Sequence, residues 1–101
     1  MGISAMPSGD GKTLTIKISD RFDFNLHSEL RRLYYQPDKR YQSYIVDLKD
    51  TTYMDSSALG MLLQLRDFAG GRREAVRVTR AQAAIKEILA VANFHQLMTV
   101  D

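Results

Sequence analysis

The residues best suited to chemistry lie together in Asp55-Ser56-Ser57, inside the segment 53–60. This segment follows a short apolar run and precedes a helical pattern, so a carboxylate and two hydroxyls are expected at the start of a helix. Short polar side chains at that position commonly cap unpaired backbone amides. A serine in the first turn is also well placed for phosphorylation, because the amides and their partial positive charge accept a phosphate. The residue types alone support both capping and phosphorylation.

Gly60 adds a second signal a few residues further along the same helical pattern. Glycine inside a helix costs about 1 kcal/mol relative to alanine, because it loses more backbone freedom on folding. A glycine at this position therefore indicates a compensating role, such as allowing the close approach of another backbone. This reasoning favours a contact surface on the predicted helix.

Other kinds of site have little support. The chain has no cysteine, which excludes disulfides, thiolate zinc sites and thiol catalysis. His27 and His95 lie far apart in the sequence, with no carboxylate at metal-ligand spacing, so we predict neither a metal site nor another cofactor. A serine hydrolase needs a Gly-x-Ser-x-Gly turn and a histidine base, and Ser56 has neither. Serine-hydrolase chemistry at Ser56 is therefore not expected.

The composition predicts one globular domain, residues 1–101, with 45% hydrophobic and 26% charged residues. The 14 basic and 12 acidic residues give a formal charge of only +2. The densest basic group, Arg72-Arg73 with Arg77 and Arg80, is interrupted by Glu74 and Asp67, so we expect no nucleic-acid partner. No segment reaches the roughly 18 apolar residues of a membrane span, and no signal sequence is recognisable. We therefore expect a cytoplasmic protein without direct membrane insertion.

Hydrophobic periodicity predicts five strands and three helices. Residues 12–19 alternate, with Leu14, Ile16 and Ile18 on one face, as in a half-buried strand. The other predicted strands are residues 1–6, 44–48, 75–79 and 97–100, and the predicted helices run from Leu26 to before Pro37, over 57–69 and over 81–92. Asn25 is predicted to cap the first helix, and Gly70-Gly71 to end the second.

The resulting order is strand, strand, helix, strand, helix, strand, helix, strand, which is typical of the α/β class. We predict a mostly parallel central sheet of four or five strands, opened by a hairpin, with helices packed on it. The tyrosines near the first helix are interpreted as half-buried packing residues: Tyr34, Tyr35, Tyr41 and Tyr44.

The segment Met54-Asp55-Ser56-Ser57-Ala58-Leu59-Gly60, with Asp47-Leu48 before it, resembles the signature of the STAS domain family of bacterial anti-sigma factor antagonists. In that family an apolar strand and a short loop precede Asp-Ser-Ser/Thr-Gly-Leu-Gly. Arg21-Phe22-Asp23 is similar to an earlier family element, and residues 76–97 resemble its last strand and helix. The chain departs from the family pattern at Ala58 and Asp20, where glycine is usual.

The resemblance implies a regulatory role in sigma-factor-dependent transcription. It implies an anti-sigma factor with serine kinase activity as the partner, inactivation by phosphorylation of Ser56 in preference to Ser57, and reactivation by a serine phosphatase. A phosphate would add about −1.5 to −2 charges next to Asp55, and like-charge repulsion would then oppose binding. Asp23 is expected near the same end of the sheet.

The partner surface is predicted to include this motif and the outer face of the following helix. Gly60, Gln64 and Asp67 share that face at helical spacing, and Leu59 and Leu63 form an apolar shoulder beside it. The alternative is that both leucines simply belong to the core.

A second function remains open from the sequence. A STAS protein can also be an accessory subunit docked on a membrane transporter's ATPase, where the same helix makes a permanent contact without phosphorylation. The intact Asp55-Ser56-Ser57 motif favours the regulatory role.

Overall fold

The first two strands form the expected hairpin. The computed structural model describes residues 2–36, 38 and 40–101. In it, β1 (Ile3–Pro7) pairs antiparallel with β2 (Thr13–Ile18), and Ile3 lies opposite Ile18. Met1, which was predicted to belong to the first strand, lies outside the described residues.

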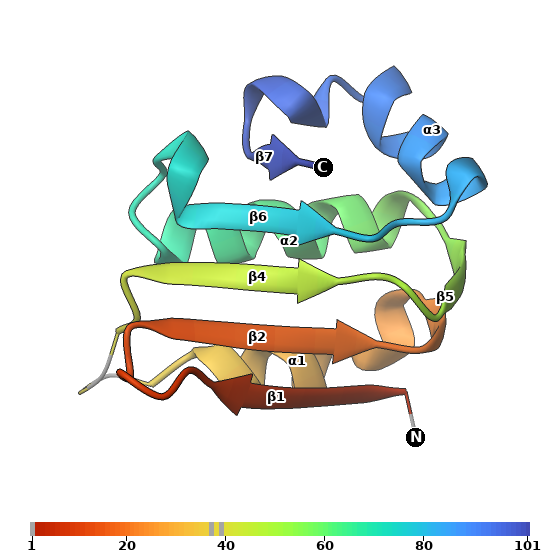
Figure 1. The fold of residues 1–101 in the computed structure, drawn as a ribbon. Coiled ribbons are helices and arrows are strands. Elements are labelled where there is room, and N and C mark those ends of the chain that lie inside the picture. Colours follow the sequence, from red (N-terminus) through yellow and green to blue (C-terminus); the bar gives the residue numbers. More distant parts are fainter. Residues whose placement is uncertain (1, 37, 39) are drawn as a thin grey trace.

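The main sheet has five strands in the order β1-β2-β4-β6-β7 (Figure 1). The three later strands are β4 (Ser43–Asp47), β6 (Val76–Thr79) and β7 (Thr99–Val100), and each pairs parallel with its neighbour. Parallel pairing needs a crossover between strands, and the helices supply it. The predicted fold class, a mostly parallel sheet opened by a hairpin, is confirmed.

One face of this sheet carries the core. Leu14, Ile16 and Ile18 of β2 are buried, whereas Lys17 between them is exposed. The buried face is covered by α1 (His27–Tyr34) and α2 (Ser56–Phe68), which lie behind the sheet in Figure 1, while α3 (Ala83–Val91) lies near the β6–β7 edge. Three short 3₁₀ turns complete the helical elements: Phe24–Leu26, Arg73–Ala75 and Phe94–Gln96.

The helix ends agree closely with the sequence signals. α2 begins one residue earlier than predicted and ends just before Gly70 and Gly71, whose φ angles are 105° and 78°. Glycine adopts such left-handed backbone conformations without steric cost, which is why it follows helix ends. α1 ends at Tyr34, and Pro37, the predicted stop, lies outside the described residues.

The predicted cap of the first helical segment is wrong. Asp23, two residues before Asn25, occupies the cap position and accepts a hydrogen bond from the Asn25 amide at 3.0 Å. Asn25 itself lies inside the 3₁₀ turn that precedes α1. The turn begins earlier than the apolar periodicity indicates, because its first residue, Phe24, is exposed and contributes nothing to the buried pattern.

A second sheet was not predicted. It consists of β3 (Asp20–Phe22) and β5 (Thr51–Met54), paired parallel. Both strands are short and carry polar residues, so neither has the alternation by which a strand is recognised. Their stability comes from distant partners, since the buried Thr51 hydroxyl donates to the carbonyl of Ile18 at 2.7 Å.

Asp20, which stands where glycine is usual in the family pattern, has a left-handed backbone conformation. Its φ is 63°, in the left-handed region, where aspartate is one of the few other residues found with any frequency. The Asp20 carbonyl accepts a hydrogen bond from the Thr52 hydroxyl at 3.2 Å, which ties this loop to β5.

The core is formed by strands and helices together. Its fully buried members include Ile16, Val46 and Val78 from the sheet and Leu62 and Leu65 from α2. Over the described part of the chain, no helix is long and apolar enough to cross a membrane.

A buried carboxylate joins the ends of β4 and β6. The side chain of Asp47 is 5% exposed; it accepts a hydrogen bond from the Lys49 amide and forms an ion pair with Arg80. Burial raises the pKa of Asp47, but the bonds from Arg80 and the Lys49 amide, with the charges of Arg80 and Lys17, outweigh this and hold it below the ordinary 3.8. The ionised form is therefore favoured in the folded protein.

Replacing this carboxylate is expected to destabilise the protein in a pH-dependent way. Asp47→Asn should lower the free energy of unfolding at pH 7 by about 1–2 kcal/mol, because a hydrogen bond to a charged group is lost and Arg80 is partly exposed. Since the pKa of Asp47 is lowered by folding, its contribution is present above 3.8 and is lost as the pH falls below that value. Urea unfolding at pH 7 and pH 3 measures both effects.

A matched control is Asp101→Asn, which removes the partner of Arg77 in a surface ion pair whose side chains are half exposed. This change should alter stability by less than about 0.5 kcal/mol. If Asp47→Asn lowered the free energy of unfolding equally at pH 7 and pH 3, the charge of the carboxylate would not be what stabilises the ends of β4 and β6.

Candidate functional site

Two aspartates are brought to the same end of the small sheet. The parallel register places Phe22 of β3 beside Met54 of β5, and the next residue in each chain segment is Asp23 or Asp55. Both aspartates cap the helical segment that follows them. Asp23 and Asp55 therefore lie at the same end of a pair of strands, β3 and β5, that the sequence pattern did not reveal.

Asp55 is the N-cap of α2. Its Oδ1 atom accepts hydrogen bonds from the Ser57 amide at 3.1 Å, the Ala58 amide at 3.2 Å and the Ser57 hydroxyl at 2.6 Å. The hydroxyl bond, helped by the two amides and opposed by slight burial, holds the pKa of Asp55 below its ordinary value. A negative charge therefore sits permanently at the start of α2, where the helix dipole favours it.

Removal of this cap gives a direct test of its structural role. Asp55→Ala should lower the free energy of unfolding by about 1 kcal/mol, because the first amides of α2 lose their acceptor. Asp55→Asn is the matched control, since its side-chain oxygen accepts the same bonds and should retain most of the stability. Chemical denaturation measures both, and equal stability of the alanine variant and the original protein would contradict the capping role.

The two serines of the motif differ in their surroundings. Ser56 is the first residue of α2 and is exposed, and its hydroxyl has no hydrogen-bond partner among the residues that the structure describes. Ser57 is half-buried and donates its hydroxyl to Asp55. Phosphorylation of Ser57 would require this bond to break. Of the two, Ser56 presents the accessible hydroxyl.

Asp23 has a mainly structural environment. Its side chain is 13% exposed, caps the 3₁₀ turn, and forms an ion pair with Arg21 at 3.3 Å. The residues that project outward here are Arg21 and Tyr53, which lie opposite each other in the strand register. The Arg21 guanidinium carbon lies 3.9 Å from the centre of the Tyr53 ring. Sequence reasoning missed this pair because it missed β3 and β5.

The residues predicted on and beside the outer face of α2 differ in their exposure. Gly60, Gln64 and Asp67 are exposed, whereas Leu59 and Leu63 are half-buried and pack against the core. The two leucines are therefore neither fully exposed contacts nor fully buried core residues.

Gly60 is open to solvent. A Cβ atom built at this position would meet no atom within 4 Å outside the local helix. The close approach that would explain the glycine is therefore not made by another part of the described chain. A residue that weakens the helix by about 1 kcal/mol is thus available for contact from outside.

Leu59 also contributes to a surface hollow between α2 and α3. The hollow has a volume of about 430 Å³ and is lined by Leu59, Ala84, Glu87, Ile88, Val91 and Ala92. Val91 is 78% exposed and adds apolar surface to the hollow. Ile88 and Ala92, which also line the hollow, are only half-buried.

No group of three or more metal-ligating side chains occurs in residues 2–36, 38 and 40–101. The site therefore consists of a capped helix start with an exposed hydroxyl, an ionised carboxylate beside it, and an accessible helix face.

The chain belongs to the STAS domain family. A family model described as "Mlab, STAS domain" matches residues 5–99. A STAS-domain containing protein of Pseudomonas aeruginosa (strain UCBPP-PA14) is 46% identical over 101 residues, covering 100% of both chains. The family resemblance of the Asp55-Ser56-Ser57 segment is thereby confirmed.

Solved structures share the fold at much lower identity. The unphosphorylated form of the anti-sigma factor antagonist SpoIIAA is 13% identical, with a TM-score of 0.72 over 98% of this chain and 86% of that chain. The STAS domain of an antisigma-factor antagonist from Rhodobacter sphaeroides is also 13% identical, with a TM-score of 0.60 over 81% of this chain and 91% of that chain. These likenesses establish the SpoIIAA-like fold.

Proposed function

We propose that this protein is an anti-sigma factor antagonist that is switched off by phosphorylation of Ser56. In this proposal it binds an anti-sigma factor with serine kinase activity in the bacterial cytoplasm and so regulates sigma-factor-dependent transcription. A serine phosphatase restores the binding form. The protein is the substrate of these enzymes and is not itself an enzyme.

The observation that carries the proposal is the exposed Ser56 hydroxyl at the start of α2, one turn from the open position at Gly60. A kinase needs an accessible hydroxyl, and a docking partner needs a surface that it can approach closely. Family membership supports this role for the motif.

The switch acts through local charge. Asp55 already accepts the amides of Ser57 and Ala58, so a phosphate on Ser56 would not find these donors available. The added charge of about −1.5 to −2 would therefore remain at the surface beside an ionised carboxylate. A partner surface that accommodates a hydroxyl would then meet like-charge repulsion and a desolvation cost, and no refolding of the protein is required.

Phosphopeptide mass spectrometry on the protein isolated from its native cells tests the proposal. We expect phosphate on Ser56, with an occupancy that differs between growing and stressed cultures. A Ser56→Ala strain, in which the modified peptide should disappear, is the control. Modification of Ser57 instead, or no phosphate in either culture, would overturn the proposed switch.

A second candidate is an accessory subunit docked on a membrane transporter's ATPase without phosphorylation. The observation that favours it is the apolar hollow beside Leu59, because permanent interfaces are more apolar than transient ones. The same mass spectrometry separates the two roles. An unmodified Ser56 in all conditions, with a transporter ATPase recovered on the protein, would support the second candidate.

A further inference from the structure

Two exposed aromatic side chains on the α1 side of the molecule lie against basic groups. The Phe24 ring is stacked on the His27 ring with 5.0 Å between their centres, and the Arg31 guanidinium carbon lies 4.8 Å from the centre of the Tyr35 ring. Phe24 and Tyr35 are 65% and 47% exposed. Tyr35 is therefore not the half-buried packing residue that the sequence indicated.

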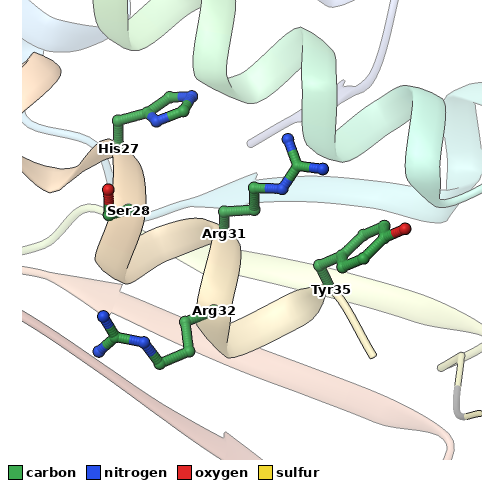
Figure 2. A pocket seen from close by; sticks show the side chains of 5 residues that line it. All are labelled: His27, Ser28, Arg31, Arg32 and Tyr35. Carbon is green, nitrogen blue, oxygen red and sulfur yellow. The ribbon is translucent and has the colours of Figure 1, made fainter. Parts of the chain in front are cut away.

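Four of these residues line one shallow hollow, and Phe24 adjoins it through His27; together they are called the α1 band: Phe24, His27, Arg31, Arg32 and Tyr35. His27, Arg31 and Tyr35 follow one another at intervals of four residues, so they share a helix face. Figure 2 shows the three side chains projecting to the same side, whereas the Arg32 side chain extends from the helix in a different direction. The shallow hollow around them has a volume of about 280 Å³.

The α1 band continues onto α2. A second hollow of about 190 Å³ shares Arg31 and Tyr35 with the first, and its other lining residues include Gln64 and Asp67. These two residues belong to the face of α2 that was predicted to contact the partner. A protein docked on α2 would therefore lie beside the α1 band.

The charges of the α1 band are not balanced within the described residues. The arginines that form ion pairs among the described residues are Arg21, Arg77 and Arg80. Neither Arg31 nor Arg32 is therefore paired with a carboxylate. Glu29 lies on the same helix and is exposed, but forms no ion pair with either arginine. Asp67 is the one acidic residue that lines the two hollows.

We propose that the α1 band binds an acidic segment of the partner protein that docks on α2. Arginine presents a fork of donors that matches a carboxylate, and stacking on Tyr35 holds the Arg31 guanidinium in place before binding. Exposed aromatic and arginine side chains are the types that contribute most to protein interfaces. The identity of the partner rests on the proposed function, whereas the preference for acidic groups rests on the charges of the α1 band.

An NMR titration of the ¹⁵N-labelled protein tests this preference. The probe is a synthetic octapeptide of six glutamates and two phenylalanines, and the control peptide has lysine in place of glutamate. We expect amide shifts confined to residues 24–35 and the adjoining end of α2 with the acidic peptide only. Binding should weaken severalfold when the salt concentration rises from about 50 to 300 mM, since salt screens charge attraction.

Charge-removing variants locate the binding site. Arg31→Gln with Arg32→Gln should weaken peptide binding at least fivefold. Lys12→Gln with Lys86→Gln removes the same charge from exposed positions elsewhere and should leave binding within twofold. Equal weakening by both pairs would overturn the proposal, because it would indicate attraction to the overall charge.

Other ligands give distinct outcomes. Tighter binding of phosphatidylglycerol vesicles or of a single-stranded DNA oligonucleotide than of the acidic peptide would overturn the assignment to a protein segment. The titration involves no kinase, so an unmodified Ser56 in cells would remove the proposed switch and leave this result unchanged. Failure of the acidic peptide to bind would overturn the proposal for the α1 band and would leave the switch at Ser56 unaffected.

Discussion

Ser56→Asp is expected to weaken binding of the anti-sigma partner at least tenfold relative to Ser56→Ala. The change places a carboxylate at an exposed position next to Asp55, whose lowered pKa keeps it ionised at neutral pH. Opposition of like charges in an interface costs several kcal/mol, and about 1.4 kcal/mol suffices for a tenfold change. The partner recovered with the tagged alanine variant can be purified, and calorimetric titration then gives the dissociation constants.

The matched control for this prediction is Ser56→Asn. Asparagine has nearly the same size and shape as aspartate but no charge, so its binding should be closer to that of Ser56→Ala. Equal dissociation constants for the aspartate and alanine variants would refute the charge mechanism. Equal weakening by aspartate and asparagine would show that size at this position, and not charge, opposes binding.

Gly60→Leu is expected to abolish partner binding while the isolated protein remains folded. A side chain at this position meets no atom within 4 Å of its Cβ in the described structure, so the fold can accept it. The added bulk would instead project into the space that the partner occupies when it lies on the outer face of α2. Circular dichroism measures the fold, and the same titration measures binding.

Gly60→Ala separates the effect of this position on folding from its effect on partner binding. Alanine should raise the free energy of unfolding by about 1 kcal/mol, because it favours the helix and its Cβ meets open space. Unaltered binding by Gly60→Leu would exclude this face from the interface. Loss of the folded spectrum in that variant would show that the glycine serves the fold.

The two predictions depend on different parts of the same helix. In the proposed mechanism, Ser56 acts through charge at the first residue of α2, and Gly60 acts through shape one turn later. A partner that responds to both must cover the start and the outer face of the helix together. The α1 band lies next to the far end of that face, where Gln64 and Asp67 adjoin Arg31 and Tyr35.

Hydrophobic periodicity in the sequence was sufficient to locate the longer strands and helices. The alternation of Leu14, Ile16 and Ile18 identified β2, and the apolar spacing over residues 57–69 identified α2 to within one residue. These patterns arise because long elements bury one face, and burial selects apolar residues at the spacing of that face. The resemblance of the Asp55-Ser56-Ser57 segment supplied the family.

Hydrophobic periodicity did not reveal the elements that are short and stabilised by contacts with distant parts of the chain. β3 and β5 have 3 and 4 residues, and their pairing depends on bonds such as that from Thr51 to the carbonyl of Ile18. The cap at Asp23 was missed for a related reason, since the turn that it caps begins with an exposed phenylalanine. Such features leave no apolar pattern in the local sequence.

The sequence by itself determined the α/β class, the order of the main strands and helices, and the motif at the start of α2. Only the tertiary structure decided that Ser56 has the accessible hydroxyl, that Ser57 is held by Asp55, and that Gly60 faces open space. The physical reason is that residue types and spacing report local preferences. Exposure and hydrogen bonding, in contrast, depend on groups that folding brings together from distant parts of the chain.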